Sequence, residues 1–127
     1  MYSLKESRRL YDNVFSVYEG DIRKVRSIGT NLIRLTGDKN RTKVWSALGN
    51  IERGYITLAD RGVKTMSRTQ KNALASNAIN LLRRTGVISP LVGRTANAFV
   101  AGVGKNALQL RNQGEEQILR ELVKLVL

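Results

Sequence analysis

Apolar residues recur at every third or fourth position along most of this chain, and this spacing constrains the fold more than any other feature. It is the spacing of one face of an α-helix, and no segment alternates apolar and polar residues as a half-buried strand does. The first such face consists of Leu10, Tyr11, Val14, Phe15 and Tyr18. The chain has one proline, Pro90. We therefore expect an all-α protein of five to six helices.

Residues that cap helices mark where three of these helices begin. Two pairs have the capping-box spacing, in which a serine side chain and a Glu or Gln three positions later bond each other's backbone amides. The pairs are Ser3 with Glu6 and Ser67 with Gln70. Ser89 followed by Pro90 predicts another start, because proline is favoured at the first helical position.

Turn residues mark where the helices end. Residues 36–40 (Thr-Gly-Asp-Lys-Asn) and residues 112–114 (Asn-Gln-Gly) are typical of turns. Gly20 and Asp21 are compatible either with one bent helix or with two separate helices. Gly49, Gly54 and Gly62 fall inside the third predicted helix, where each costs about 1 kcal/mol relative to alanine. The predicted helices, taking the undecided first one as a single stretch, cover residues 3–35, 41–66, 67–86, 90–108 and 115–127.

The length of 127 residues suits one domain. Within it we expect a longer basic N-terminal helical region over residues 1–66 and a C-terminal helical bundle over residues 67–127. The two regions are expected to fold as one cooperative unit.

Charge is the main indication of function. The chain has 22 Lys and Arg against 10 Asp and Glu, a net charge of +12, which repels itself unless a partner offsets it. No acidic residue occurs between Arg61 and Gly114, although this span carries nine cations. Solubility alone is served by mixed signs of charge. The distribution therefore predicts a polyanionic partner, and nucleic acid above all.

A second basic cluster lies between Ile22 and Asn50, where Asp38 is the only acid. Phosphate contacts need such repeated cations. The candidate nucleic-acid-binding residues are Arg23, Lys24, Arg26, Arg34, Arg41, Lys43, Arg61, Lys64, Arg68, Lys71, Arg83, Arg84 and Arg94. Amide side chains that could add hydrogen bonds to phosphate, sugar or base are Asn31, Asn40, Asn72, Asn77, Asn80, Asn97 and Asn106.

The few aromatic residues lie on the apolar faces, so we expect them to pack in the core rather than to stack on bases. These are Tyr11, Phe15, Tyr18, Trp45 and Tyr55. Binding of single strands by base stacking is therefore not expected.

Catalytic chemistry is not indicated. The chain has no histidine and no cysteine, which removes the commonest general base, the thiol nucleophile and the usual zinc ligands. Gly102-Val103-Gly104 lacks the third glycine of a dinucleotide-binding loop. No spacing of carboxylates indicates a metal site. We expect no enzyme, no metal and no cofactor.

The segment from Ala78 to Leu110 contains a helix, the turn Gly86-Val87-Ile88-Ser89-Pro90 and a helix of small residues with Ala107-Leu108. Together with Gln117-Ile118-Leu119 it resembles the helical major capsid proteins of rod-shaped and filamentous archaeal viruses. The chain departs from them in lacking a long segment before the last helix. The resemblance implies a self-associating capsid subunit whose N-terminal helices wrap double-stranded DNA. The DNA-facing residues would be Arg23, Lys24, Arg26, Arg41 and Lys43.

We therefore expect a non-enzymatic structural protein that packages nucleic acid, double-stranded DNA being favoured, as a homo-oligomeric virion or nucleoprotein subunit. No signal peptide or membrane-spanning segment is expected, and the location is the virion, or the cytoplasm and nucleoid. Two alternatives stay open. One is a basic helical toxin or phage-delivered protein that acts on membranes. The other is an adaptor or inhibitor that binds an acidic protein.

Overall fold

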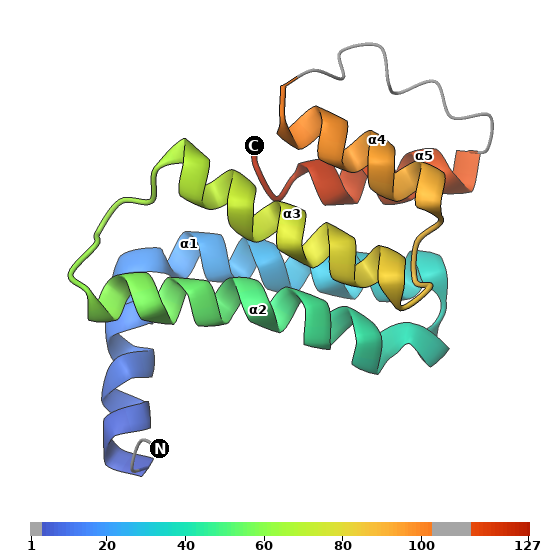
Figure 1. The fold of residues 1–127 in the computed structure, drawn as a ribbon. Helices are drawn as coiled ribbons and strands as arrows, with labels where there is room; N and C mark the ends of the chain where they lie inside the picture. Colours follow the sequence, from blue (N-terminus) through green and yellow to red (C-terminus); the bar gives the residue numbers. More distant parts are fainter. Residues whose placement is uncertain (1–3, 103–112) are drawn as a thin grey trace.

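The computed structural model describes the backbone of residues 4–102 and 113–127, and the side chains of residues 17–102 and 113–127. Within these ranges the protein is all-α, as predicted, with five α-helices, one short 3₁₀ turn and no strand (Figure 1). The elements are α1 (Leu4–Thr36), η1 (Asp38–Asn40), α2 (Arg41–Asp60), α3 (Arg68–Arg84), α4 (Pro90–Val100) and α5 (Gln113–Val123).

The helices pack in a closed order around one core. Each helix contacts the next in the chain from α1 to α4, α4 contacts α5, and α5 returns to α1. The largest fully buried side chains come from all five helices, and burying each one contributes about 1.5–3 kcal/mol. They are Ile22, Ile28, Leu32, Val44, Leu48, Ile79, Leu82, Val92, Leu119 and Leu122.

The first helix consists of two helical stretches joined by a kink, and the kink lies at Tyr18 rather than at Gly20 and Asp21. Tyr18 has non-helical dihedral angles of −119° and 23°. Its ring stacks on Tyr55 with 5.3 Å between the centroids, and its hydroxyl donates to the backbone oxygen of Val63 at 2.6 Å. The part of α1 before the bend leads away from the bundle (Figure 1). The bend therefore coincides with the place where α1 gains tertiary contacts to α2 and to the segment after it.

Glycines end three helices, and two of these ends correct the sequence prediction. Gly62, Gly86 and Gly102 have φ of 79°, 79° and 77°, the left-handed conformation that favours glycine after a helix. The helix predicted over residues 41–66 stops at Asp60, and the one predicted over residues 90–108 stops at Val100. The end predicted near Gly86 is confirmed.

The predicted stop at residues 112–114 is wrong for its last two members, because α5 begins at Gln113. At its other end α5 stops at Val123 instead of Leu127. The amides of Lys124, Leu125 and Val126 then bond the carbonyls three residues earlier, in the tighter 3₁₀ pattern.

The capping predictions hold wherever they can be examined. Gln70 N donates to Ser67 Oγ at 3.1 Å and Ser67 N donates to Gln70 Oε1 at 2.9 Å, a complete capping box. Ser89 Oγ accepts from Val92 N at 3.2 Å, with Pro90 at the first helical position. The predicted pair Ser3 and Glu6 lies outside the residues whose side chains are described.

Candidate nucleic-acid interface

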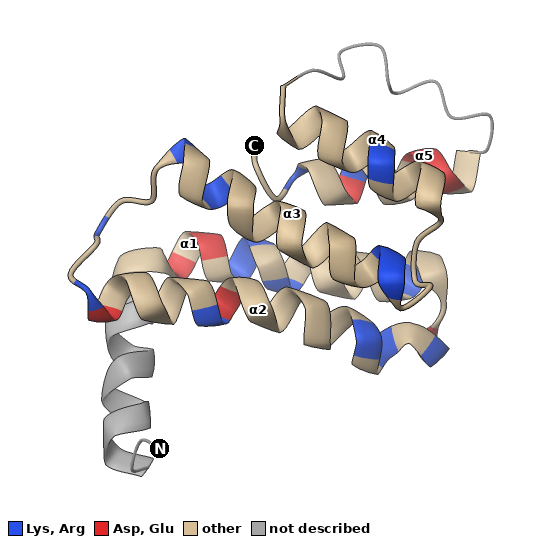
Figure 2. Cartoon of the chain, in the orientation of Figure 1, with Lys and Arg blue, Asp and Glu red and all other residues tan. Residues whose placement is uncertain are grey.

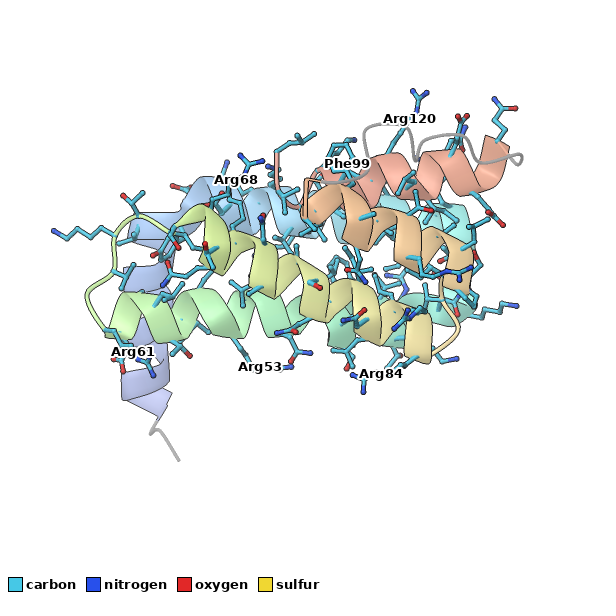
Figure 3. The ribbon with its side chains drawn as sticks, turned by 45° about the horizontal axis from the view of Figure 1, so that its top comes forward. Arg53, Arg61, Arg68, Arg84, Phe99 and Arg120 are labelled. Carbon is cyan, nitrogen blue, oxygen red and sulfur yellow. The ribbon has the colours of Figure 1, made fainter. Side chains whose placement is uncertain are left out.

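The predicted binding residues do not form one surface. Lys and Arg are spread over several helices of the bundle (Figure 2). Arg53 and Arg84 point away from one side of the molecule, whereas Arg68 and Arg120 lie at the opposite side (Figure 3). The interface therefore has to be found from the local surroundings of each cation.

Three cations of the N-terminal cluster have acidic partners within the chain. Arg23 pairs with Glu19 at 2.7 Å, Arg26 with Glu52 at 3.0 Å, and Arg41 with Asp38 at 2.6 Å. These three are therefore weak candidates for phosphate binding. Arg34 and Lys43 of the same cluster are exposed.

Lys24 is also engaged. Its Nζ donates to the backbone oxygen of Leu127, and burial, followed by repulsion from Lys71, lowers its pKa below the ordinary value of lysine. An ammonium that is already desolvated and repelled by its neighbour is better regarded as part of the fold than as a free phosphate ligand.

A groove between α2 and α3 collects a different set of side chains. We call it the α2–α3 groove, and it is a hollow of about 620 Å³ lined by Asn50, Asn77, Asn80, Leu81, Arg83 and Arg84. None of the described residues that line it is acidic. A cleft lined by one sign of charge concentrates counter-ions of the opposite sign.

The helical register of α3 explains why these residues share a face. Asn77, Asn80 and Arg84 are three and four positions apart, so they follow one side of the helix. The fully buried Ile79 and Leu82 occupy another side and pack into the core. The apolar spacing that holds α3 in place thus also aims its polar side chains into the groove.

Arg83 lines the groove, and its aliphatic part lies against α4. A Cβ atom built on Gly93 would lie 2.8–3.3 Å from the Cδ, Cγ and Cβ atoms of Arg83. The aliphatic part of Arg83 therefore rests directly on the backbone of α4, where any larger residue than glycine would displace it.

Two of the groove asparagines are held by other side chains. Asn80 Oδ1 accepts from Asn97 Nδ2 at 2.9 Å, and Asn97 Oδ1 accepts from Ser76 Oγ at 3.1 Å. Asn50 Oδ1 accepts from Arg53 Nη2. Sequence reasoning missed Asn50 and Arg53. Both lie on α2, where Glu52 and Asp60 offset part of the positive charge, so this stretch of the sequence does not stand out as basic.

A second hollow is lined by residues of the α1–α2 and α3–α4 connections, which lie at the same end of the bundle (Figure 1). We call it the turn hollow. Its volume is about 610 Å³, and it is lined by Thr36, Lys39, Asn40, Lys43, Gly86, Val87 and Ile118. It likewise has no acidic lining residue, and Gly86 stands two positions after Arg84 of the α2–α3 groove.

The other predicted residues are not brought to these hollows. Arg61, Lys64 and Arg68 are exposed around the α2–α3 connection, close in the chain to Asp60. Lys71 lies near Lys24, and Arg94 is exposed on α4.

Among the predicted asparagines, Asn31 Nδ2 donates to Glu121 and Asn40 Nδ2 donates to the carbonyl of Thr36. Asn97 supports the groove from behind. Asn106 lies outside the described residues.

The described aromatic residues pack as predicted. Tyr18 and Tyr55 are buried, and a Cβ atom on Gly29 would lie within 2.6 Å of two ring atoms of Trp45. Trp45 also lines a separate hollow, together with Glu52. Neither the α2–α3 groove nor the turn hollow has an aromatic lining residue.

Other kinds of site find little support in the part of the chain that the structure describes. Its carboxylates form no group of three or more that could hold a metal ion. None of its helices combines the length and the apolar character needed to cross a bilayer. The large apolar side chains exposed there belong to Val17, Leu91 and Leu127, which lie on different elements.

Comparison of the chain with protein-family models, with curated proteins and with solved structures found no match. The resemblance to viral capsid proteins stays a prediction.

Proposed function

We propose that this chain is a non-enzymatic, nucleic-acid-binding structural protein that neutralises the phosphate backbone through the α2–α3 groove and the turn hollow. The observation that carries the proposal is the composition of these hollows. Both contain cations and amides, and neither contains an acid. Such a set of side chains suits phosphate oxygens, which are negatively charged hydrogen-bond acceptors.

Double-stranded DNA is the favoured ligand. The lining residues offer no ring on which an unpaired base could stack, so the proposed contacts are to the backbone. A protein that binds the backbone at many sites packages nucleic acid without reading it. This is the role of a virion or nucleoprotein subunit acting in many copies, as the resemblance to capsid proteins also implies.

The proposal is tested by titrating a labelled random-sequence duplex with the protein at increasing salt. The logarithm of the association constant should fall linearly with the logarithm of salt, with a slope of about −0.9 for each phosphate neutralised. Arg84→Gln should make this slope shallower by about 0.9. The matched control is Arg23→Gln, which removes the same charge from a side chain already paired with Glu19 and should leave the slope unchanged.

A flat salt response would overturn the proposal. Equal effects of the two variants on the slope would show that the α2–α3 groove does not contribute to binding. Two further measurements address the alternatives. Dye release from anionic vesicles would favour action on membranes. Capture of an acidic protein that persists after nuclease treatment would favour an adaptor. Electron microscopy with and without DNA tests assembly, for which we expect ordered particles or filaments with DNA.

A further inference from the structure

The groove asparagines that are held in place are both held by their carbonyl oxygens. Asn97 Nδ2 donates to Asn80 Oδ1, and Arg53 Nη2 donates to Asn50 Oδ1. An asparagine has one acceptor end and one donor end. Each of these oxygens has used one of its two lone pairs, whereas neither Nδ2 group has an acceptor among the described residues, so the Nδ2 groups of Asn50 and Asn80 are the more available ends.

The remaining polar groups of the groove are also donors. The guanidinium groups of Arg83 and Arg84 donate only and never accept. Asn77 is exposed and has no hydrogen bond to a described residue, so it can turn its Nδ2 toward an acceptor. No lining residue carries a carboxylate.

We infer that the α2–α3 groove is a donor-rich site for the phosphodiester oxygens of nucleic acid, and that it binds them with no preference for base sequence. The inference deepens the proposed function and rests on it. Asn97 and Arg53 are positioning residues in this inference, because each fixes which end of a groove asparagine faces the ligand.

The hydrogen-bonding pattern distinguishes backbone from bases. To read adenine, an asparagine must offer both its acceptor and its donor, and the existing bonds from Arg53 and Asn97 to the oxygens of Asn50 and Asn80 compete with that arrangement. Cytosine presents a donor in the major groove, which a donor-rich site disfavours. Guanine presents two acceptors, so G·C-rich duplex is the sequence on which a preference would show. Phosphate presents acceptors at every nucleotide.

A first experiment separates phosphate from base on the intact protein. The side-chain amide resonances of Asn50 and Asn80 are followed by NMR during addition of tripolyphosphate, which has no base, or of adenosine, which has no phosphate. We expect both resonances to shift with tripolyphosphate and to stay in place with adenosine. Shifts with adenosine, or none with tripolyphosphate, would overturn the inference.

A second experiment reverses Asn80. In Asn97→Asp the donor to Asn80 Oδ1 is lost, and the new carboxylate accepts from Ser76 Oγ and from Asn80 Nδ2. The amide of Asn80 then turns its oxygen into the groove. We expect binding to duplex DNA to weaken about tenfold, the factor that one hydrogen bond to a charged group supplies. The control Gln117→Glu makes the same change of charge on an exposed position of α5 and should weaken binding much less.

Equal weakening in Asn97→Asp and Gln117→Glu would contradict the positioning role. Wild-type affinities for A·T-only and G·C-only duplexes should agree within about threefold, which corresponds to less than 1 kcal/mol. A larger preference for either duplex would overturn the inference while leaving nucleic-acid binding intact. Absence of any duplex binding would overturn the proposed function itself, so the two failures are distinguishable.

Discussion

Asparagine and basic side chains occur both in the α2–α3 groove and at the contact between α1 and α5, which we call the seam. In the seam they have an acidic partner, and in the groove they have none. In the seam, Asn31 Nδ2 and Lys124 Nζ donate to the two oxygens of Glu121, at 2.9 and 2.8 Å. Glu121 is only 8% exposed, so this carboxylate is buried, whereas the side chain of Lys124 stays half exposed. In the groove, the asparagines and arginines surround no carboxylate at all.

The comparison shows that the position of the acids decides what the cations and amides do. Where the chain supplies an acid, as at Glu19, Glu52 and Glu121, the donors become part of the fold. Where it supplies none, the donors remain available to a ligand. The number of cations in a segment is therefore a poorer guide to binding than the placement of its few acids.

The largest expected effect comes from breaking the seam. Glu121→Ala leaves the amide of Asn31 without its acceptor and should lower the free energy of unfolding by about 2–3 kcal/mol, because an unsatisfied buried donor and a lost charged hydrogen bond both cost stability. Chemical denaturation followed by circular dichroism measures it. Glu121→Gln keeps an acceptor and should lose less than Glu121→Ala.

The corresponding change in the groove serves as the control. Asn80→Ala should cost less than about 1 kcal/mol of stability, the contribution of one ordinary hydrogen bond, while weakening duplex binding. If Asn80→Ala destabilised the protein as much as Glu121→Ala does, the distinction between a structural seam and a ligand-facing groove would collapse.

The second prediction compares two glycines at the contact between α1 and α2, Gly29 on α1 and Gly49 on α2. A Cβ atom on Gly29 would lie 2.3 Å from Trp45 Cζ3, whereas one on Gly49 would meet nothing nearer than Arg53 Nη1 at 3.8 Å. Gly29→Ala should therefore destabilise the protein by about 1–2 kcal/mol, since overpacking exceeds the gain in helix propensity. Gly49→Ala should stabilise it by about 0.5–1 kcal/mol.

Thermal unfolding of the two variants beside the wild-type protein measures both effects. Changes of the same sign would contradict the tight packing of α1 on Trp45.

The sequence predicted the helices well because their signal is local. The spacing of apolar residues and the caps at Ser67 and Ser89 act within a few positions, and both appear as predicted. The helix ends at Gly62 and Gly102 were harder to predict, because a glycine inside a periodic stretch is compatible with a helix interior and with a helix end. Only the tertiary path of the chain decides between them, and here both adopt the left-handed conformation that ends a helix.

The site was predictable only in part. Arg83 and Arg84 follow from the acid-free span, and Asn77 and Asn80 from their polar character. The sequence could not show that Arg26 is paired, because Arg26 meets Glu52 across 26 positions of the chain, whereas the pairs of Arg23 with Glu19 and of Arg41 with Asp38 are local. Nor could it show that Arg53 and Asn97 orient groove asparagines, which depends on how α2, α3 and α4 pack.

The third prediction concerns the tyrosine pair at the bend of α1. Burial, followed by the charge of Asp21, raises the pKa of both Tyr18 and Tyr55 above the ordinary value of tyrosine. A pKa that is higher in the folded than in the unfolded protein favours folding while the group is neutral. This contribution is complete below about pH 10, the ordinary pKa, and is lost as the pH rises through the folded value.

The unfolding free energy should therefore fall above about pH 10, and the double variant Tyr18→Phe/Tyr55→Phe should flatten this fall. At neutral pH, Tyr18→Phe alone should cost about 1 kcal/mol through loss of its bond to Val63. Denaturation at a series of pH values tests both statements, with tyrosinate absorbance reporting the ionisation. An unchanged alkaline profile in the double variant would contradict them.

The smallest effect should appear in the stability of the two arginine variants without any ligand. Arg84 has Arg83 beside it and no acid in its groove, so Arg84→Gln relieves repulsion and should stabilise the protein by a few tenths of a kcal/mol at low salt. Arg23→Gln gives up the exposed pair with Glu19 and should be neutral or slightly destabilising. Both differences should vanish at about 1 M salt, where charges more than about 3 Å apart are screened. If Arg84→Gln instead destabilised the free protein, Arg84 would already have a partner within the chain. The α2–α3 groove would then be a structural contact like the seam and would not be a binding site.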